Sequence, residues 1–144
     1  MKSFEELTIT PRVHACLAAH CLTSSALEQV GVLLGRGSSI EDVCPLPNHA
    51  LGADKFLILA SDLSTARAAA LDAGLHILGR YHTHLPQRPS PSRADRHSLP
   101  NGWLEMIVCV GRRDGHRIIT STRIFDCSGN LVPLTLLNPS GVMA

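Results

Sequence analysis

Short apolar runs separated by turn-forming residues dominate the hydrophobic pattern of the chain. Such runs are typical of strands, because four to eight apolar or β-branched residues bounded by glycine, proline or asparagine suit a buried sheet. Pro133 has no backbone N–H, so a strand that contains it is confined to a sheet edge. The pattern predicts strands at residues 7–10, 30–36, 40–45, 56–59, 75–84, 104–110, 117–125 and 131–136.

Two longer segments have helical character instead. Residues 11–23 begin with a proline, whose missing N–H costs nothing at a first helical position, and Thr10 can cap them. Residues 63–73 carry an alanine-rich packing face, with Asp62 as the expected cap and Gly74 as the residue after the helix end. A third, short helix is expected to open at the serine of position 92.

The order strand, helix, strand over residues 56–84 predicts a crossover connection on one face of a sheet. With the remaining strands it indicates the α/β class, as a mixed sheet flanked by helices. A length of 144 residues suits one domain with a sizeable core, and no repeat, linker or low-complexity segment divides the chain. We therefore expect a single domain over residues 1–144, with its core at about 8–136.

Composition narrows the classes of partner. Hydrophobic residues make up 44% of the chain and charged residues 17%, as in globular rather than disordered proteins. The thirteen basic residues are scattered, the net charge is +1, and only one Trp, one Tyr and three Phe are present. This argues against nucleic-acid binding, which favours a basic patch with interleaved aromatic residues. No apolar run approaches the ~18 residues of a membrane span, so no membrane partner is expected.

Cysteine usage bears on the compartment. The five cysteines include no C-x-x-C pair, and residues 1–6 show no signal-peptide h-region. An odd number of cysteines without a secretory leader favours reduced thiols. We therefore expect a cytoplasmic protein.

The candidate chemistry is concentrated in one motif, H-x-H-x7-S-x-x-D, formed by His82, His84, Ser92 and Asp95. Residues two apart on a strand project to the same face, about 7 Å apart along it, so the two imidazoles can converge on one ion. Prolines in the following turn stop strand and helix alike. The carboxylate of Asp95 can then swing back to the histidines. Two imidazoles and one carboxylate leave a fourth position open, as a catalytic zinc site requires.

Each half of this motif also has a plainer interpretation. Ser-x-x-Asp at a helix start is a capping box with an acid at its third position, and Ser92 can serve as cap and as functional group. A lone H-x-H is more often a pair of ordinary strand residues. The combination, with a proline-rich turn of fixed length between its halves, favours the metal site. His97 follows the motif and is expected to be solvated, although a substrate contact is the alternative.

Glu28 is a second candidate, far upstream. It stands at the start of an apolar strand, where an unpaired buried carboxylate would be costly. The alternative is an exposed helix end with the carboxylate in water. The residue types alone leave these two possibilities evenly balanced.

Three motifs in this order resemble the JAMM (MPN+) metallopeptidase family. They are E-x-x-G-x-L-x-G from Glu28, P-x-P-N ending at Asn48, and G-x-x-H-x-H-x7-S-x-x-D from Gly79. The match spans about residues 8–125 and looks most like the small prokaryotic members. One departure is Leu85, where the family usually has proline directly after the second histidine; here proline follows at position 86.

The resemblance implies a cytidine-deaminase-like JAMM/MPN fold and a role for each motif residue. His82, His84 and Asp95 would bind one Zn²⁺ per chain. Glu28 would hold the attacking water and act as general base, and Ser92 would donate a hydrogen bond to the developing oxyanion. The implied activity is zinc-dependent hydrolysis of a peptide or isopeptide amide bond.

The resemblance also implies a partner, a ubiquitin-like sulfur-carrier protein whose C-terminal tail is processed. A groove beside the sheet edge is expected to receive that tail by strand addition, and a homodimer is compatible with the sequence. The alternatives are a non-catalytic MPN-type scaffold, a zinc hydrolase of a small amide or a cell-wall or phage peptide, and a zinc deaminase. The deaminase class expects a P-C-x-x-C pair, which is missing from the sequence.

Overall fold

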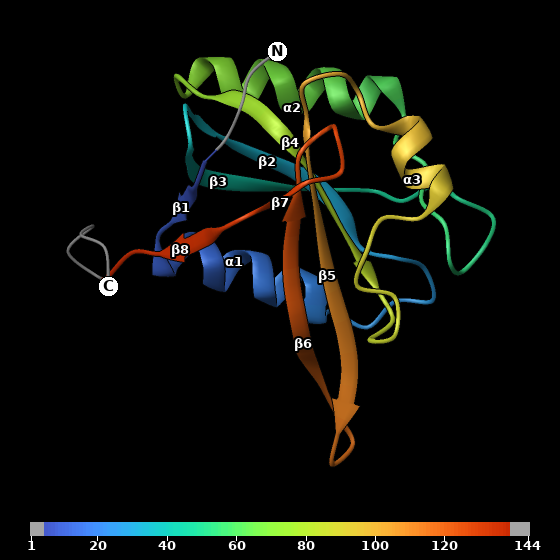
Figure 1. The fold of residues 1–144 in the computed structure, drawn as a ribbon. Coiled ribbons are helices and arrows are strands. Elements are labelled where there is room, and N and C mark those ends of the chain that lie inside the picture. Colours follow the sequence, from blue (N-terminus) through green and yellow to red (C-terminus); the bar gives the residue numbers. More distant parts are fainter. Residues whose placement is uncertain (1–4, 139–144) are drawn as a thin grey trace.

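One curled, mixed sheet of eight strands runs through the protein, whose computed structural model describes residues 5–138 (Figure 1). The strand order is β7-β6-β5-β4-β2-β3-β1-β8. The strands are β1 (Leu7–Ile9), β2 (Val30–Arg36), β3 (Ser39–Leu46), β4 (His76–His84), β5 (Leu104–Arg113), β6 (His116–Phe125), β7 (Leu131–Val132) and β8 (Leu134–Leu136). The helices are α1 (Pro11–Leu22), α2 (Ala60–Asp72) and α3 (Arg93–Ser98).

β4, which carries both motif histidines, is an interior strand. It pairs antiparallel with β2, where His82 faces Val30, and parallel with β5, where His84 faces Cys109. Both edges of β4 are therefore occupied by backbone hydrogen bonds, and strands with two neighbours fluctuate least. The fold thus places the two imidazoles on a strand that is held by a neighbour on each side.

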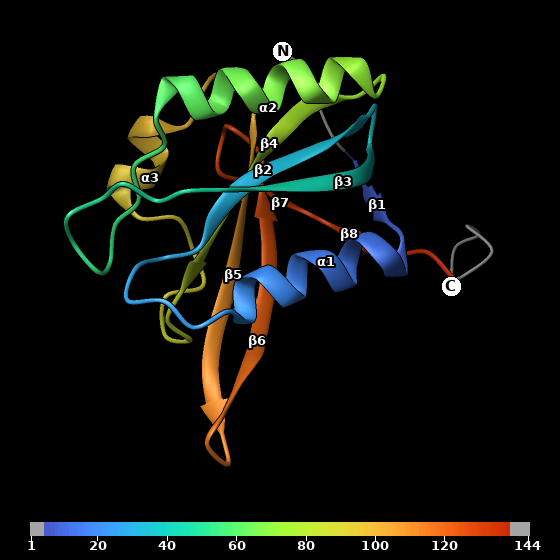
Figure 2. The same cartoon turned by 180° about the vertical axis from the view of Figure 1, so that it is seen from behind.

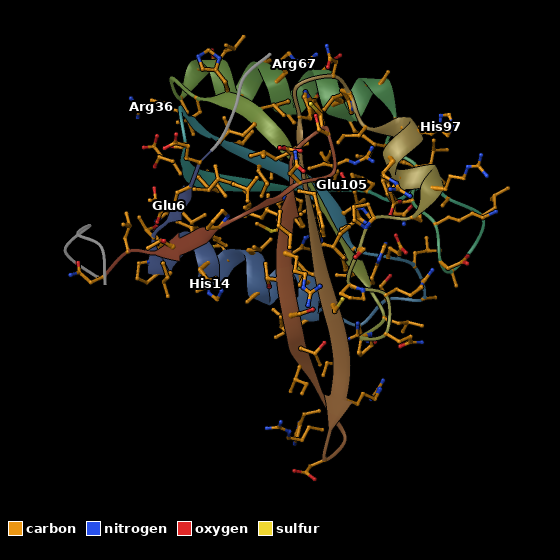
Figure 3. All side chains as sticks on the ribbon, viewed as in Figure 1. Glu6, His14, Arg36, Arg67, His97 and Glu105 are labelled. Atoms are coloured by element: carbon orange, nitrogen blue, oxygen red, sulfur yellow. The ribbon has the colours of Figure 1, made fainter. Side chains whose placement is uncertain are left out.

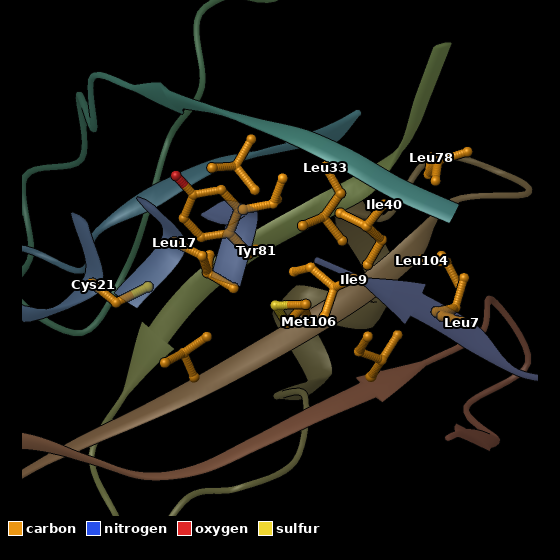
Figure 4. Close-up of a cluster of buried hydrophobic side chains, with 14 of the residues drawn as sticks. Leu7, Ile9, Leu17, Cys21, Leu33, Ile40, Leu78, Tyr81, Leu104 and Met106 are labelled. Carbon is orange, nitrogen blue, oxygen red and sulfur yellow. The ribbon is translucent and has the colours of Figure 1, made fainter. Parts of the chain in front are cut away.

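Alternating side chains of β2 divide the core into two layers. Leu33 belongs to the cluster that includes Leu17 and Cys21 of α1, shown in Figure 4 with Tyr81 and Met106. Val32 and Leu34 belong to the cluster that includes Ala66 and Ala70 of α2. The period of two in the strand therefore explains why α1 and α2 cover opposite faces of the sheet, as Figure 2 shows from behind.

The predicted last strand is split at Pro133 into β7 and β8, which lie at opposite ends of the strand order. Only one residue separates these two strands, so the two ends of the sheet are at most about 7 Å apart at this point. The sheet must therefore curl until its edges approach each other. The carbonyl of Pro133 accepts a hydrogen bond of 2.9 Å from the N–H of Leu7, which ties the join to β1.

The expected strand at residues 56–59 is wrong. These residues form an extended loop, in which Leu57 bonds to His49 and Asn48 rather than to a neighbouring strand. Side-chain exposure alternates along this apolar run: Leu57 and Leu59 face solvent, while Phe56 and Ile58 are partly buried. The crossover exists, but it runs from β3 through α2 to β4: both strands are antiparallel to β2 and therefore parallel to each other.

Helix ends follow the sequence in part. Thr10 caps α1 as predicted, its hydroxyl accepting from the N–H of Val13. The prediction that Asp62 caps α2 is wrong, because α2 begins at Ala60 and Asp62 lies in its first turn. There its carboxylate adds a favourable charge at the helix N-terminus.

Some expectations fall outside the described residues. The expectation that the N-terminus is not a signal peptide concerns residues 1–6, and of these the structure leaves residues 1–4 undescribed. Residues 139–144 at the other end are not described either. Within residues 5–138, the helices lack the length and apolar character that a membrane crossing requires.

The β4–β5 contact yields a test of the packing. A Cβ added at Gly79 would lie 2.2 Å from the carbonyl oxygen of Leu104, a backbone atom that cannot move aside. We expect Gly79→Ala to lower the free energy of unfolding by about 3 kcal/mol or more, measured by urea denaturation. Gly52→Ala is the control, since its nearest neighbour is the flexible Lys55 side chain at 3.4 Å. Equal losses in both variants would contradict the close strand approach.

Candidate metal centre

Backbone hydrogen bonds bring Glu28 to the histidines. Gln29, which follows it, donates its N–H to the Thr83 hydroxyl at 2.9 Å and accepts at its carbonyl from the Thr83 N–H at 3.0 Å. Thr83 stands between the two histidines on β4, so this double contact fixes Glu28 opposite them. The side chain of Glu28 is buried, and the alternative of an exposed helix end is wrong.

Asn48, the end of the P-x-P-N motif, secures the other side of Glu28. Its amide nitrogen donates to the carbonyls of Glu28 and Lys55, each at 2.9 Å. Its amide oxygen accepts from the N–H groups of Ala50 and Leu57 at 2.9 and 3.0 Å. One side chain therefore closes the 48–57 loop and ties that loop to the segment that holds the acid.

The proton position on His84 follows from its partner. Nδ1 lies 2.8 Å from the carbonyl oxygen of Arg88, which can only accept, so Nδ1 carries the hydrogen. The lone pair is left on Nε2, which lies 3.2 Å from Asp95 Oδ2 and 3.9 Å from Glu28 Oε2. A histidine held in this way is oriented as metal-binding histidines usually are.

His82 is oriented by an acid that the sequence analysis missed. Its Nε2 lies 2.7 Å from Glu105 Oε1, on the neighbouring strand β5. Its Nδ1 is buried and makes no hydrogen bond within the described chain, although Glu28 Oε1 lies 3.3 Å away. The ring of Phe56 packs on the imidazole, with ring centroids 4.4 Å apart. His82 thus has one ring nitrogen, Nε2, that is hydrogen-bonded and another, Nδ1, that is not, and carboxylates lie close to both.

Asp95 reaches the site from the first turn of α3. The capping box is present as predicted: Ser92 Oγ accepts from the Asp95 N–H at 3.0 Å, and Asp95 Oδ2 accepts from the Ser92 N–H at 2.8 Å. The same Oδ2 lies 3.8 Å from His82 Nε2. Asp95 therefore takes part in the capping box of α3 and also lies beside the two histidines, as the two interpretations of the motif predicted.

Arg80 and Glu105 form a buried ion pair beneath the site. The guanidinium makes two contacts to the carboxylate, of 2.6 and 3.1 Å, with both side chains almost fully buried. Arg80 also donates to the carbonyl of Asp95 at 2.7 Å and to the hydroxyl of Ser98 at 3.1 Å. Figure 3 labels Glu105 in the centre of the molecule. The pair therefore joins β4, β5 and α3, and it holds Asp95 in place through its backbone.

The sequence does carry a signal for this pair. Arg80 and Glu105 each interrupt an apolar strand, and a charged side chain within such a run must find a partner when buried. What the sequence does not show is that the parallel register sets the two residues opposite each other.

The surrounding carboxylates favour a positive charge on His82. Burial by itself lowers the pKa of His82, but the hydrogen bond to Glu105 and the nearby carboxylates of Glu28 and Asp95 raise it overall to about 9. Burial by itself raises the pKa of Asp95. The contact with His84, the charge on His82 and the Ser92 N–H have the larger combined effect, and they hold this pKa well below its ordinary value. In the metal-free protein, a proton on His82 supplies the charge that a metal ion would supply.

The donor set fits a metal ion. Two triplets have donor atoms that all lie within 4.8 Å of one another: Glu28 with His82 and His84, and His82 with Asp95 and Glu105. The predicted ligands are distributed over both triplets. Buried imidazole and carboxylate donors suit zinc, and the unpartnered Nδ1 of His82 is a donor atom without another task.

Two other sequence candidates lie farther out. Ser92 is exposed at the start of α3, adjacent to Asp95. His97 is exposed on the same helix, where Figure 3 labels it, as the solvated interpretation expected. Leu85, the departure from the family motif, is 53% exposed just beyond the second histidine. The structure thus gathers Glu28, both histidines and Asp95, and leaves Ser92 at the rim.

A cavity of about 600 Å³ opens onto this group. Its lining includes Glu28 and His84, Leu27 and Pro86, and residues near the end of the β5–β6 hairpin. The cavity lies beyond the last pairing of β4 with β5, where β4 no longer covers the edge of β5. The expected binding of a tail in a groove beside a sheet edge stays a prediction.

Comparison with protein-family models matches residues 10–124 to the prokaryotic homologs of the JAB domain, Prok-JAB. The chain belongs to this family. The match covers most of the 144 residues and confirms the resemblance to JAMM/MPN proteins that the motifs indicated. No curated protein matches the chain significantly.

Solved structures agree on the fold of this Prok-JAB domain. A Desulfitobacterium hafniense protein solved in solution aligns with a TM-score of 0.72 at 22% identity, over 92% of this chain and 93% of that one. A JAB1/MPN domain protein from Archaeoglobus fulgidus aligns with a TM-score of 0.59 at 15% identity, over 90% and 98%. A structure described as a metalloprotease-like JAMM zinc site aligns with a TM-score of 0.54 at 15% identity, over 92% and 98%. The predicted mixed sheet flanked by helices, in one domain, is confirmed.

Glu105→Gln tests the support beneath the metal centre. The change keeps the size of the side chain and removes its charge, so Arg80 loses its counter-ion and His82 its anionic partner. We expect the free energy of unfolding to fall by about 3–5 kcal/mol and zinc affinity to weaken about 10- to 100-fold, measured by urea denaturation and chelator competition. Glu41→Gln, which removes the exposed partner of Arg36, should cost less than about 1 kcal/mol and leave zinc affinity unchanged. Unchanged zinc affinity in Glu105→Gln would contradict the orienting role.

The raised pKa of His82 predicts a response of the metal-free protein to pH. Protonated His82 contributes stability fully below its ordinary value of 6.5, and this contribution is lost as the pH rises through about 9. The loss is at most about 3 kcal/mol. Urea denaturation in chelator from pH 6 to 10 should show this fall, and His82→Gln should show a flatter curve. Parallel curves for the two proteins would argue against the raised pKa.

Proposed function

We propose that this Prok-JAB domain is a zinc-dependent hydrolase that cleaves a peptide or isopeptide amide bond. The observation that supports the proposal most directly is the convergence of four ionisable side chains from three separate segments, of which Glu28 and His84 line the cavity; the other two are His82 and Asp95. A plain scaffold has no need for four buried ionisable groups, because each costs free energy unless it is compensated.

Each residue of the centre then has a task. His82, His84 and Asp95 would hold the ion, with Glu105 and the Arg88 carbonyl orienting the two imidazoles. A zinc ion bound there acts as a Lewis acid and lowers the pKa of water toward ~7. The ligands come from β4 and from the capped first turn of α3, and such rigid elements suit a site that must keep its geometry.

Glu28 acts as general base. Its carboxylate faces the histidines and lines the cavity, so it can accept a proton from the attacking water. It then returns that proton to the amine nitrogen of the departing group. The backbone clamp to Thr83 and the Asn48 side chain hold this carboxylate without using its oxygens.

Ser92 is proposed to stabilise the oxyanion. Its oxygen accepts from the Asp95 N–H, and among residues 5–138 its hydroxyl hydrogen is not assigned to an acceptor. That hydrogen is free to be donated toward the substrate, and one such donor is typically worth ~3 kcal/mol of transition-state stabilisation.

The proposed substrate is the C-terminal tail of a ubiquitin-like sulfur-carrier protein. The support is the small size of the domain and its likeness to prokaryotic members of the family. The cavity also offers a route for an extended chain. β5 runs on past its last pairing with β4, at His84 and Cys109, so its outer edge is open to a strand-like tail there.

Intact-mass measurement tests the proposal. A sulfur-carrier protein extended past its Gly-Gly end is incubated with the zinc-loaded domain. We expect a mass drop equal to the extension with the wild type and with the control Glu41→Gln. Glu28→Gln should abolish the drop while zinc stays bound, and Ser92→Ala should slow it about 10²- to 10³-fold.

Each other result of this experiment would change a different part of the proposed function. Activity in Glu28→Gln would remove that residue from the chemistry, and an unchanged rate in Ser92→Ala would reduce it to a helix cap. A wild type that binds zinc without cleaving would discard this substrate and leave a small amide or another peptide. A domain that neither binds zinc nor cleaves would favour the scaffold alternative.

A further inference from the structure

Three arginines line the cavity that opens onto Glu28: Arg88, Arg112 and Arg117. Within residues 5–138, none of them forms an ion pair with a carboxylate. This contrasts with Arg80, whose guanidinium is fully engaged nearby. The cavity lining therefore contains two acids, Glu28 and Asp54, and three arginines that form no ion pair with either of them.

Two of these arginines are placed unfavourably for the protein alone. Arg112 of β5 and Arg117 of β6 are directly opposite each other in the antiparallel pair. Like charges in that position destabilise a hairpin. The Nε atom of Arg117 is moreover buried and lacks a hydrogen-bond partner in the described chain. An anion between the two guanidinium groups would relieve both the repulsion and the unpaired donor.

Arg88 is fixed next to the metal centre. Its carbonyl accepts from His84 Nδ1 at 2.8 Å and from the Cys109 thiol at 3.7 Å, which holds the 85–88 loop against β5. The β5–β6 hairpin projects beyond β4 in Figure 1, so the arginine pair lies past the end of the histidine strand. Arg112 is three residues beyond Cys109, about 10 Å farther along the strand.

We propose that these arginines bind the free α-carboxylate at the end of the substrate, and that the domain removes a short C-terminal segment of about one to three residues. This rests on the proposed function. An extended chain advances ~3.3 Å per residue, so a terminus this far past the scissile bond comes within reach of long arginine side chains. A carboxylate is the anion that every such tail carries, and the guanidinium fork matches it.

The experiment uses two fluorescent peptides, each ending in Ala-Gly-Gly-Ala, one with a free α-carboxylate and one with a C-terminal amide. For the zinc-loaded wild type, Arg117→Gln and Arg112→Gln, both kcat/KM and the Kd from fluorescence anisotropy are measured. Arg113→Gln is the matched control, because Arg113 is an exposed neighbour that does not line the cavity.

We expect the wild type and Arg113→Gln to favour the free acid about 10- to 100-fold, the range for a hydrogen bond between charged groups. Arg117→Gln should reduce this preference to less than about threefold, and Arg112→Gln should reduce it as well. The amide peptide serves as internal reference, because loss of folding or of zinc would lower both substrates together.

Each remaining result separates the inference from the proposed function. Cleavage of both peptides at equal rates by the wild type would keep the hydrolase and overturn the carboxylate site. Selective binding of the acid that depends on Arg117, without cleavage, would keep the site and discard hydrolysis of such peptides. An equal loss for acid and amide in an Arg117→Gln variant that remains folded and zinc-loaded would overturn the proposal, because the arginine would then not distinguish the free carboxylate. Binding that fails to distinguish the peptides would also overturn it.

Discussion

The buried ion pair between Arg80 and Glu105 is the interaction on which the metal centre depends. Two charges in the interior are costly, and the pair is tolerated because its geometry is bidentate and its remaining donors are used. Arg80 uses those donors on α3, at the carbonyl of Asp95, and Glu105 uses an oxygen on His82. One salt bridge thus sets the position of a helix and the orientation of an imidazole. Its energetic value to the domain is this positioning, since a buried pair by itself adds little net stability.

Two regions of the molecule differ in whether their charged side chains have partners of opposite charge. Beneath the histidines, every charged side chain has partners, and the carboxylates outnumber the cations until a proton or a metal ion is added. Along the cavity, Arg112 and Arg117 of the β5–β6 hairpin lie opposite each other, and neither forms an ion pair with a carboxylate of residues 5–138. Under the proposed function, the first region binds a metal ion, and under the further inference the second binds the terminal carboxylate of a peptide tail.

Sequence patterns predicted the structure correctly where it depends on interactions between residues close together in the chain. The hairpin of β2 and β3, the cap at Thr10 and the capping box at Ser92 depend on neighbours within a few residues. They failed at residues 56–59, where a short continuous apolar run resembles a buried strand but has no strand beside it. Phe56 and Ile58 turn inward because His82 and the α2 layer lie below them, which no local pattern reveals. The sequence predicted that Pro133 confines the last strand to a sheet edge, but it predicted neither the split of that strand into β7 and β8 nor the curling of the sheet that results.

By itself, the sequence determined the spacing of His82, His84, Ser92 and Asp95, because a strand followed by a proline-rich turn and a capped helix fixes these residues relative to one another. It also determined the family, through motifs that span most of the chain. Only the tertiary structure decided that Glu28 is buried opposite the histidines, because its position depends on hydrogen bonds to Thr83 and Asn48, far away in the chain. The same holds for Glu105 and for the pair Arg112 and Arg117. Their partners are set by strand register, which pairs residues that no sequence separation identifies.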